Sequence, residues 1–142
     1  MQHGFELYST ALLGIGVLLL MVFVQWLIAS RCKASESGAI PGTPPKNMSH
    51  LNFTFRAWRT HQNTLENLGA MLGASFFAIL AGSAPTLVAV LVWAMVLARI
   101  MHMVLYYCIA TEQNPSPRSY FFLIAWLANL GLVAVGLHTL LT

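Results

Sequence analysis

The sequence predicts an all-α integral membrane protein, a bundle of four transmembrane helices, and three observations support this fold class. First, 58% of the 142 residues are hydrophobic and 8% are charged, whereas a soluble globular domain carries about 25% charged residues. Second, the charge-free runs are long enough to cross a bilayer, which takes about 20 apolar residues. Third, polar or Gly/Pro-rich segments divide these runs into four. We therefore expect residues 1–142 to form a single membrane domain.

The first span is expected at about residues 7–30, which contain no charged residue. The residues before it lack the basic region of a cleaved signal peptide, so this run is expected to remain as a helix. Residues 31–50 are polar and contain the stretch Pro-Gly-Thr-Pro-Pro at 41–45. This composition predicts a loop.

The next charge-free run, residues 67–98, is too long for one comfortable crossing, and the Gly-Ser-Ala-Pro sequence at 82–85 predicts a turn within it. We place the second helix at about 53–81 and the third at about 86–111. Residues 112–117 form a second polar loop. Ser116 is a suitable N-cap and Pro117 suits the first helical position, so the fourth helix is expected at about 117–141.

The basic residues predict the orientation of the bundle. They lie in or beside the two polar loops: Arg31, Lys33, Lys46, Arg56, Arg59 and Arg118. The turn between the second and third spans and both termini carry no Lys or Arg. The positive-inside rule then places both polar loops in the cytoplasm and both termini on the opposite side.

Two predicted spans each carry a polar stripe whose members share one helix face. The stripes are Arg99, His102 and Tyr106 in the third span and Arg59, Asn63 and Glu66 in the second. An arginine within the hydrocarbon layer usually faces a bundle interior or a water-filled pocket and marks a functional site. Both stripes, together with Arg118 and Ser119 at the start of the fourth span, approach the cytoplasmic side. The sequence therefore predicts a polar funnel that opens to the cytoplasm.

The charges of this funnel indicate a small ligand with more than one anionic group and one cationic group, because arginines outnumber the single glutamate and arginine binds carboxylates in a bidentate way. Glutathione has this charge pattern, and so do other small zwitterions. The residues alone do not choose between them. Several enzyme classes lack their signatures, since the chain has no Gly-x-Ser-x-Gly elbow and no phosphate-binding glycine loop.

Nucleic-acid and metal sites are not expected. The basic residues are scattered rather than clustered with aromatic residues, which gives no support to nucleic-acid binding. Cys32 and Cys108 have neither CxxC spacing nor histidine partners, so both are interpreted as free thiols. The remaining histidines are expected to be interfacial or solvated: His3, His50, His61 and His138.

Three ordered motifs resemble the MAPEG family, the membrane-associated proteins of eicosanoid and glutathione metabolism. Residues 59–66 (RTHQNTLE) resemble its Arg-x-x-x-Asn-x-x-Glu signature, and residues 98–106 (ARIMHMVLY) resemble its Ala/Gly-Arg-x-x-His-x-x-x-Tyr helix. Arg118-Ser119 is similar to the Arg-Ser pair that opens the fourth helix in the prostaglandin E synthase branch. Gln62 differs from the basic residue of several catalytic members. Phe122 and Leu123 replace the Tyr and Thr of the prostaglandin synthase, which argues against that isomerase activity.

The resemblance implies a homotrimer that binds glutathione between neighbouring subunits on the cytoplasmic side. It implies that Arg118 and Ser119 lie beside the thiol, and that Arg31 is contributed by the neighbouring protomer. The implied contacts to the rest of glutathione are Arg59, Asn63, Glu66, His102 and Tyr106. For Arg99 two interpretations stay open: contact with the ligand, or an ion pair with Glu66 that holds helices together.

The predicted function is a glutathione-dependent membrane transferase with peroxidase activity, acting on lipophilic electrophiles or lipid hydroperoxides. A cation and a helix N-terminus lower the pKa of a nearby thiol, so we expect Arg118, Ser119 and the start of the fourth helix to stabilise the glutathione thiolate. The alternative is a non-catalytic lipid-binding or scaffold protein of the same fold. A small transporter has less support, because the chain shows no internal repeat.

Overall fold

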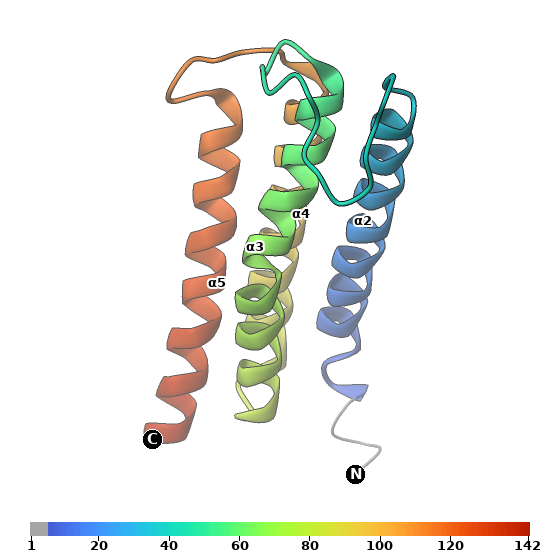
Figure 1. Cartoon of the computed structure of the whole chain (residues 1–142). Helices are drawn as coiled ribbons and strands as arrows, with labels where there is room; N and C mark the ends of the chain where they lie inside the picture. The colour runs from blue at the N-terminus through green and yellow to red at the C-terminus, as the bar shows by residue number, and fades with distance from the viewer. Residues whose placement is uncertain (1–5) are drawn as a thin grey trace.

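The computed structural model describes residues 6–142, which contain four long helices in antiparallel order (Figure 1). They are α2 (Ser9–Ala34), α3 (Phe53–Leu80), α4 (Pro85–Cys108) and α5 (Pro117–Leu141). The segments that join α2 to α3 and α4 to α5 lie together at one end of the bundle, here called the loop end. The start of α2, the turn between α3 and α4, and the C-terminus lie at the opposite end (Figure 1). His3 lies outside the described residues.

Two helix ends differ from the prediction. Helix α2 continues to Ala34, so Arg31 and Lys33 lie in its last turn rather than in a loop, where the helix dipole favours cations. Helix α4 ends at Cys108, three residues before the expected end. The predicted start of α5 is confirmed: Ser116 is the N-cap and Pro117 begins the helix. The turn after α3 is also confirmed, with Gly82 at a φ of 75°, a conformation that glycine adopts without steric cost.

Three of the described helices, α2, α4 and α5, are long and apolar enough to span a membrane. Helix α3 has sufficient length but a lower overall hydropathy, because its first half carries charged and amide side chains, among them Arg59 and Glu66. Large apolar side chains are exposed along the outside of the bundle, including Phe23 on α2 and Leu130 on α5. This surface suits lipid rather than water as the surrounding solvent.

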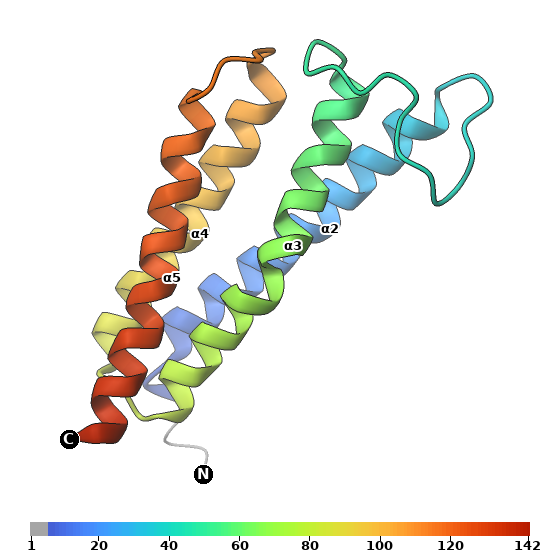
Figure 2. The same ribbon diagram turned by 60° about the vertical axis from the view of Figure 1, so that its left-hand side comes forward.

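The helices pack closely at the end far from the loops and separate toward the loop end. A Cβ atom added at Gly136 of α5 would lie 2.6 Å from the Phe77 ring of α3 and 3.4 Å from the Cα of Ala78. Small residues permit this approach of two helices. In Figure 2, α4 and α5 diverge from α2 and α3 toward the loop end. Polar side chains line a cavity at that end.

Candidate functional site

A cavity of about 370 Å³ lies at the loop end between α3, α4, α5 and the two connecting segments. Its volume falls in the range of roughly 300–1,000 Å³ found for small-molecule sites. The lining residues come from all of these elements: His50, Asn63, His102, Tyr106, Glu112, Gln113, Asn114, Ser116, Arg118, Ser119 and Phe122. The wall is therefore predominantly polar, in a bundle whose outer surface is apolar.

Arg118 is fixed in the cavity wall by the first turn of α5. Its Nε donates to Ser116 Oγ at 3.1 Å, and its Nη2 donates to the Thr111 carbonyl at 3.1 Å. The guanidinium carbon lies 4.0 Å from the centre of the Tyr106 ring. The remaining nitrogen, Nη1, is buried and has no hydrogen-bond partner among the described residues. The contacts with Ser116, Thr111 and Tyr106 therefore hold the guanidinium in place and leave Nη1 as a donor without a hydrogen bond.

Ser119 and Ser116 form a reciprocal capping box at the start of α5. The Ser116 backbone N–H donates to Ser119 Oγ at 3.3 Å. The hydroxyl oxygens of Ser116 and Ser119 also lie 3.3 Å apart, and either can be the donor. When Ser116 donates, the Ser119 hydroxyl proton is available to a ligand. The first backbone N–H groups of a helix also attract anions. The two predicted catalytic residues therefore lie together on a positively polarised helix end.

His102 and Tyr106 line the same cavity from α4. Both are buried, and their rings lie 5.4 Å apart between centroids. The Phe122 ring of α5 lies 6.2 Å from the His102 ring and closes the cavity on its deeper side. The stripe predicted from the spacing of α4 thus faces the bundle interior.

Unpartnered polar atoms surround the cavity. In the part of the chain that the structure describes, Asn63 Oδ1, His102 Nδ1, His50 Nδ1 and Arg118 Nη1 are buried without a hydrogen-bond partner. Buried polar groups are normally satisfied, and leaving each one unpaired costs about 1–3 kcal/mol. The cavity therefore suits a ligand with several hydrogen-bonding groups.

Arg99 lies deeper, about 14 Å along the helix axis from the end of α4. It is 2% exposed, and its Nη2 donates to Thr64 Oγ1 at 2.8 Å. Of the two interpretations left open for Arg99, the ion pair with Glu66 is not formed in this structure, because Glu66 pairs with Arg59 instead. Arg99 lines a separate cavity of about 80 Å³, whose wall shares Phe122 with the main cavity.

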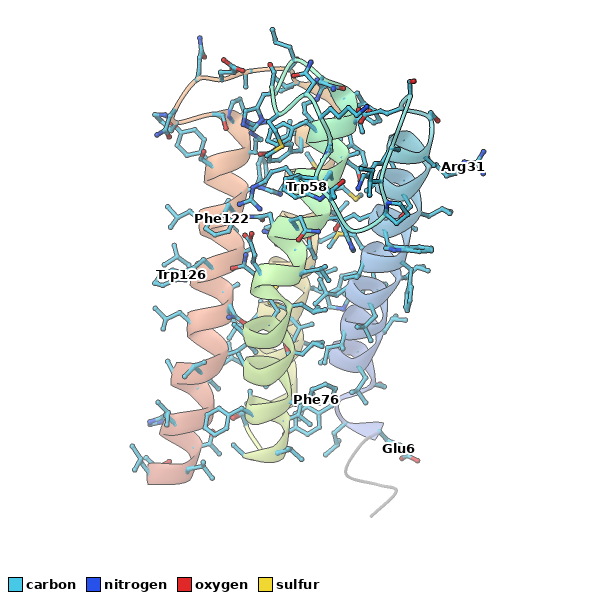
Figure 3. The ribbon with its side chains drawn as sticks, viewed as in Figure 1. Glu6, Arg31, Trp58, Phe76, Phe122 and Trp126 are labelled. Atoms are coloured by element: carbon cyan, nitrogen blue, oxygen red, sulfur yellow. The ribbon has the colours of Figure 1, made fainter. Side chains whose placement is uncertain are left out.

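The Arg59–Glu66 ion pair lies on the exposed side of α3, outside the cavity wall. Arg59 donates through Nη1 and Nη2 to the two carboxylate oxygens of Glu66, at 3.0 and 3.2 Å. The side chains of Arg59 and Glu66 are 32% and 55% exposed. Arg31 also lies apart from the cavity, at the loop end of α2 and pointing away from the bundle (Figure 3). A single chain therefore brings together five of the predicted site residues: Asn63, His102, Tyr106, Arg118 and Ser119.

The structure adds His50 and Glu112 to the site, two loop residues that the sequence patterns did not identify. His50, which the sequence placed at the interface or in solvent, is partly buried, and its ring centroid lies 5.7 Å from that of Tyr106. Burial, with help from the nearby Arg118, lowers the pKa of His50 from its ordinary 6.5, although Glu112 opposes the shift. Ser49 donates to Glu112 Oε1 at 3.1 Å and joins the two loops. His61, which was expected to be interfacial or solvated, is buried instead.

Metal ligation finds no support among residues 6–142, which hold no cluster of three or more His, Cys, Asp or Glu residues. Both Cys32 and Cys108 are free thiols, as the sequence predicted.

Comparison with known proteins gives one clear match. Neither a search of curated proteins nor a search of solved structures finds a match to this chain. The sequence model of the MAPEG family matches residues 8–138, nearly the whole length. The match includes every residue that lines the cavity. The chain therefore belongs to the MAPEG family.

Proposed function

We propose that this protein is a glutathione-dependent membrane transferase with peroxidase activity. One observation carries the proposal: the buried Arg118, which holds an unpartnered Nη1 at the wall of a polar cavity and at the N-terminus of α5. A free thiol has a pKa near about 8.5. A fixed guanidinium and a helix N-terminus both favour the thiolate over the thiol. In this proposal the sulfur binds beside Arg118, and Ser119 donates its hydroxyl proton to it.

The other polar groups suit the remainder of glutathione, which carries two carboxylates and one ammonium. Asn63 and His102 offer buried, unpartnered atoms to the peptide groups. Arg59 and Glu66 form a pair of opposite charges that can separate to bind a carboxylate and an ammonium, respectively. We assign a supporting role to Arg99, which donates a hydrogen bond to Thr64 and lies deeper on α4 than His102 does.

The exposed charges of α3 support an oligomer, and the family resemblance implies that this oligomer is a homotrimer. Glu66 lies about 20 Å along the helix from the start of α3 at Phe53, a depth at which exposure of a charge to lipid is costly. A neighbouring protomer that covers this face would remove the cost. The same arrangement would allow Arg31 of the neighbour to reach the site, which its position on α2 does not allow within one chain.

The charge distribution supports a cytoplasmic opening, because the basic residues other than Arg99 lie toward the loop end, whereas the start of α2 and the C-terminus lie at the other end. Glutathione would enter from the cytoplasm. A lipophilic electrophile would arrive from the bilayer. The thiolate then attacks the electrophilic carbon, a C–S bond forms, and the leaving group departs with its electron pair.

The test is the ultraviolet absorbance of the thiolate after glutathione is added to the purified protein in detergent. We expect a new thiolate band with glutathione and none with S-methylglutathione, which has no ionisable thiol. Calorimetry should detect binding of both compounds. Binding of neither compound, or binding of glutathione without thiolate, would favour the non-catalytic lipid-binding or scaffold alternative.

A further inference from the structure

His50 is held against the cavity by contacts on several sides. The backbone carbonyl of His50 accepts a hydrogen bond of 2.8 Å from Arg56 Nη1, and Arg56 Nε donates to the Tyr106 carbonyl at 3.0 Å. The buried Arg56 therefore ties the segment before α3 to the end of α4. The His50 ring packs edge-on against Phe55, at 5.0 Å between centroids. These contacts fix the imidazole although it lies outside any helix.

The fixed imidazole shares a neighbour with Arg118. The His50 ring lies 5.7 Å from the Tyr106 ring, and the Arg118 guanidinium carbon lies 4.0 Å from the same ring. His50 Nδ1 is buried and has no partner among the described residues. Both side chains line the one cavity. A thiol bound beside Arg118 would thus have an uncommitted imidazole within the same enclosure.

We propose that His50 is the general base that removes the proton from the bound thiol. This inference rests on the proposed function. In the step, the S–H bond breaks, the electron pair stays on sulfur, and the proton moves to the neutral imidazole of His50. The thiolate remains beside Arg118. When the thiolate adds to an electrophilic carbon and leaves an anion on the acceptor, the imidazolium returns its proton to that anion, so charge and protons balance.

The groups that face His50 suit this role. Arg118 of α5 and Arg56 and Arg59 of α3 disfavour the imidazolium, whereas Glu112 of the α4–α5 segment favours it. Tyr106 of α4 contributes its ring face. Burial and the arginines keep the imidazole neutral near pH 7, which is the form that accepts a proton. A base works best when its pKa lies near the working pH, and Glu112 limits how far the arginines lower it.

The test measures the rate of thiolate formation by stopped-flow absorbance after glutathione is mixed with the full-length protein. Three variants are compared with the wild type. His50→Gln retains a polar side chain without a base, and His50→Phe retains the aromatic packing against Phe55. His138→Gln is the matched control, because His138 is exposed at the far end of α5. Thermal unfolding checks that each variant is folded.

For the wild type and His138→Gln we expect a rate that is still constant at pH 6.5 and falls only as the pH approaches the lowered pKa of His50. Both His50 variants should form thiolate about 100-fold more slowly at pH 7, the lower end of the effect of a general base. Their rates should rise with hydroxide concentration, and added imidazole should accelerate them but not the wild type. Calorimetric affinity for S-methylglutathione should not change.

Several results would overturn the inference. One is a wild-type rate and pH profile in both His50 variants. Another is that the His50 variants bind S-methylglutathione so much more weakly that the lost affinity explains the whole decrease in rate. His50 would then act in ligand binding. A wild type that binds glutathione but forms no thiolate would overturn the proposed function itself, and this outcome is recognised before any variant is compared.

Discussion

The guanidinium of Arg118 stacks on the ring of Tyr106, with 4.0 Å between the guanidinium carbon and the ring centroid, although the two residues belong to different helices. The ring face carries partial negative charge and attracts the cation. Hydrogen bonds to Ser116 and Thr111 occupy two of the three guanidinium nitrogens. The free nitrogen is therefore fixed in position before any ligand arrives, which is the condition for strong electrostatic stabilisation of a developing charge.

Arg118→Ala should lower kcat by about 100- to 1,000-fold, the loss expected when one aimed electrostatic donor is removed. Binding of glutathione should change little, because the charge of Arg118 matters most once the thiol ionises. Arg118→Lys keeps the charge but loses the planar fork, so it should recover part of the rate. Steady-state kinetics and calorimetry check these effects, with Lys46→Ala as the control. A kcat near the wild-type value in Arg118→Ala would direct attention to Tyr106 as the partner of the thiol.

Arg59→Gln and Glu66→Gln should weaken glutathione binding and leave kcat nearly unchanged. These groups would meet parts of the tripeptide whose charge is constant during the reaction. Loss of one charge-assisted hydrogen bond, about 1.5–3 kcal/mol, corresponds to a roughly ten- to hundredfold rise in Kd. Calorimetric titration measures this change. If kcat instead fell as steeply as in Arg118→Ala, the assignment of Arg59 and Glu66 to ligand binding, and of Arg118 to the rate, would be wrong.

The stability of the protein should decrease at acidic pH through His50. Because burial and Arg118 lower the pKa of the folded-state imidazole from 6.5, the unfolded state binds the proton more readily. The unfolding free energy is then highest above about pH 6.5 and falls as the pH drops toward the lowered pKa. Thermal unfolding at a series of pH values should show this loss in the wild type and a smaller one in His50→Gln. Parallel curves for the two proteins would contradict the prediction.

Gly136→Ala should destabilise the bundle, because the added methyl group would lie 2.6 Å from the Phe77 ring and close to the α3 backbone. Overpacking of this kind costs about 1–3 kcal/mol. Gly69→Ala is the matched control, since an added Cβ at Gly69 meets no atom within 4 Å. The measurement is the melting temperature in one detergent. Equal melting temperatures for the two variants would show that Phe77 moves aside without cost.

The sequence predicted helix boundaries well where local chemistry sets them. The Ser116-Pro117 start of α5 and the turn at Gly82 depend on capping and backbone freedom, which are visible in short motifs. The ends of α2 and α4 were placed less well. The charges of Arg31 and Lys33 led to the prediction of a loop. Cations are also favourable in the last turn of a helix, which is where both residues lie.

The candidate site was predictable where helix periodicity controls it. Spacing alone placed His102 and Tyr106 on one buried face of α4. Spacing could not decide which partner Glu66 takes, since this depends on the rotation of α3 relative to α4. The sequence did not identify His50 as a site residue, because its position depends on a long-range contact. This contact is the hydrogen bond from Arg56 to the Tyr106 carbonyl near the end of α4. Loop conformation is set by such tertiary contacts rather than by local sequence.

The hydrogen bond from Ser49 to Glu112 joins the two segments that line the mouth of the cavity. Helices form the floor of the cavity, whereas part of its wall consists of the two connecting segments. If a bound molecule leaves through this wall, its release requires the Ser49–Glu112 hydrogen bond to break, whereas its affinity depends on the polar groups of the helices. Turnover limited by such release would respond to solvent viscosity and to changes in either segment while the chemical step stayed the same.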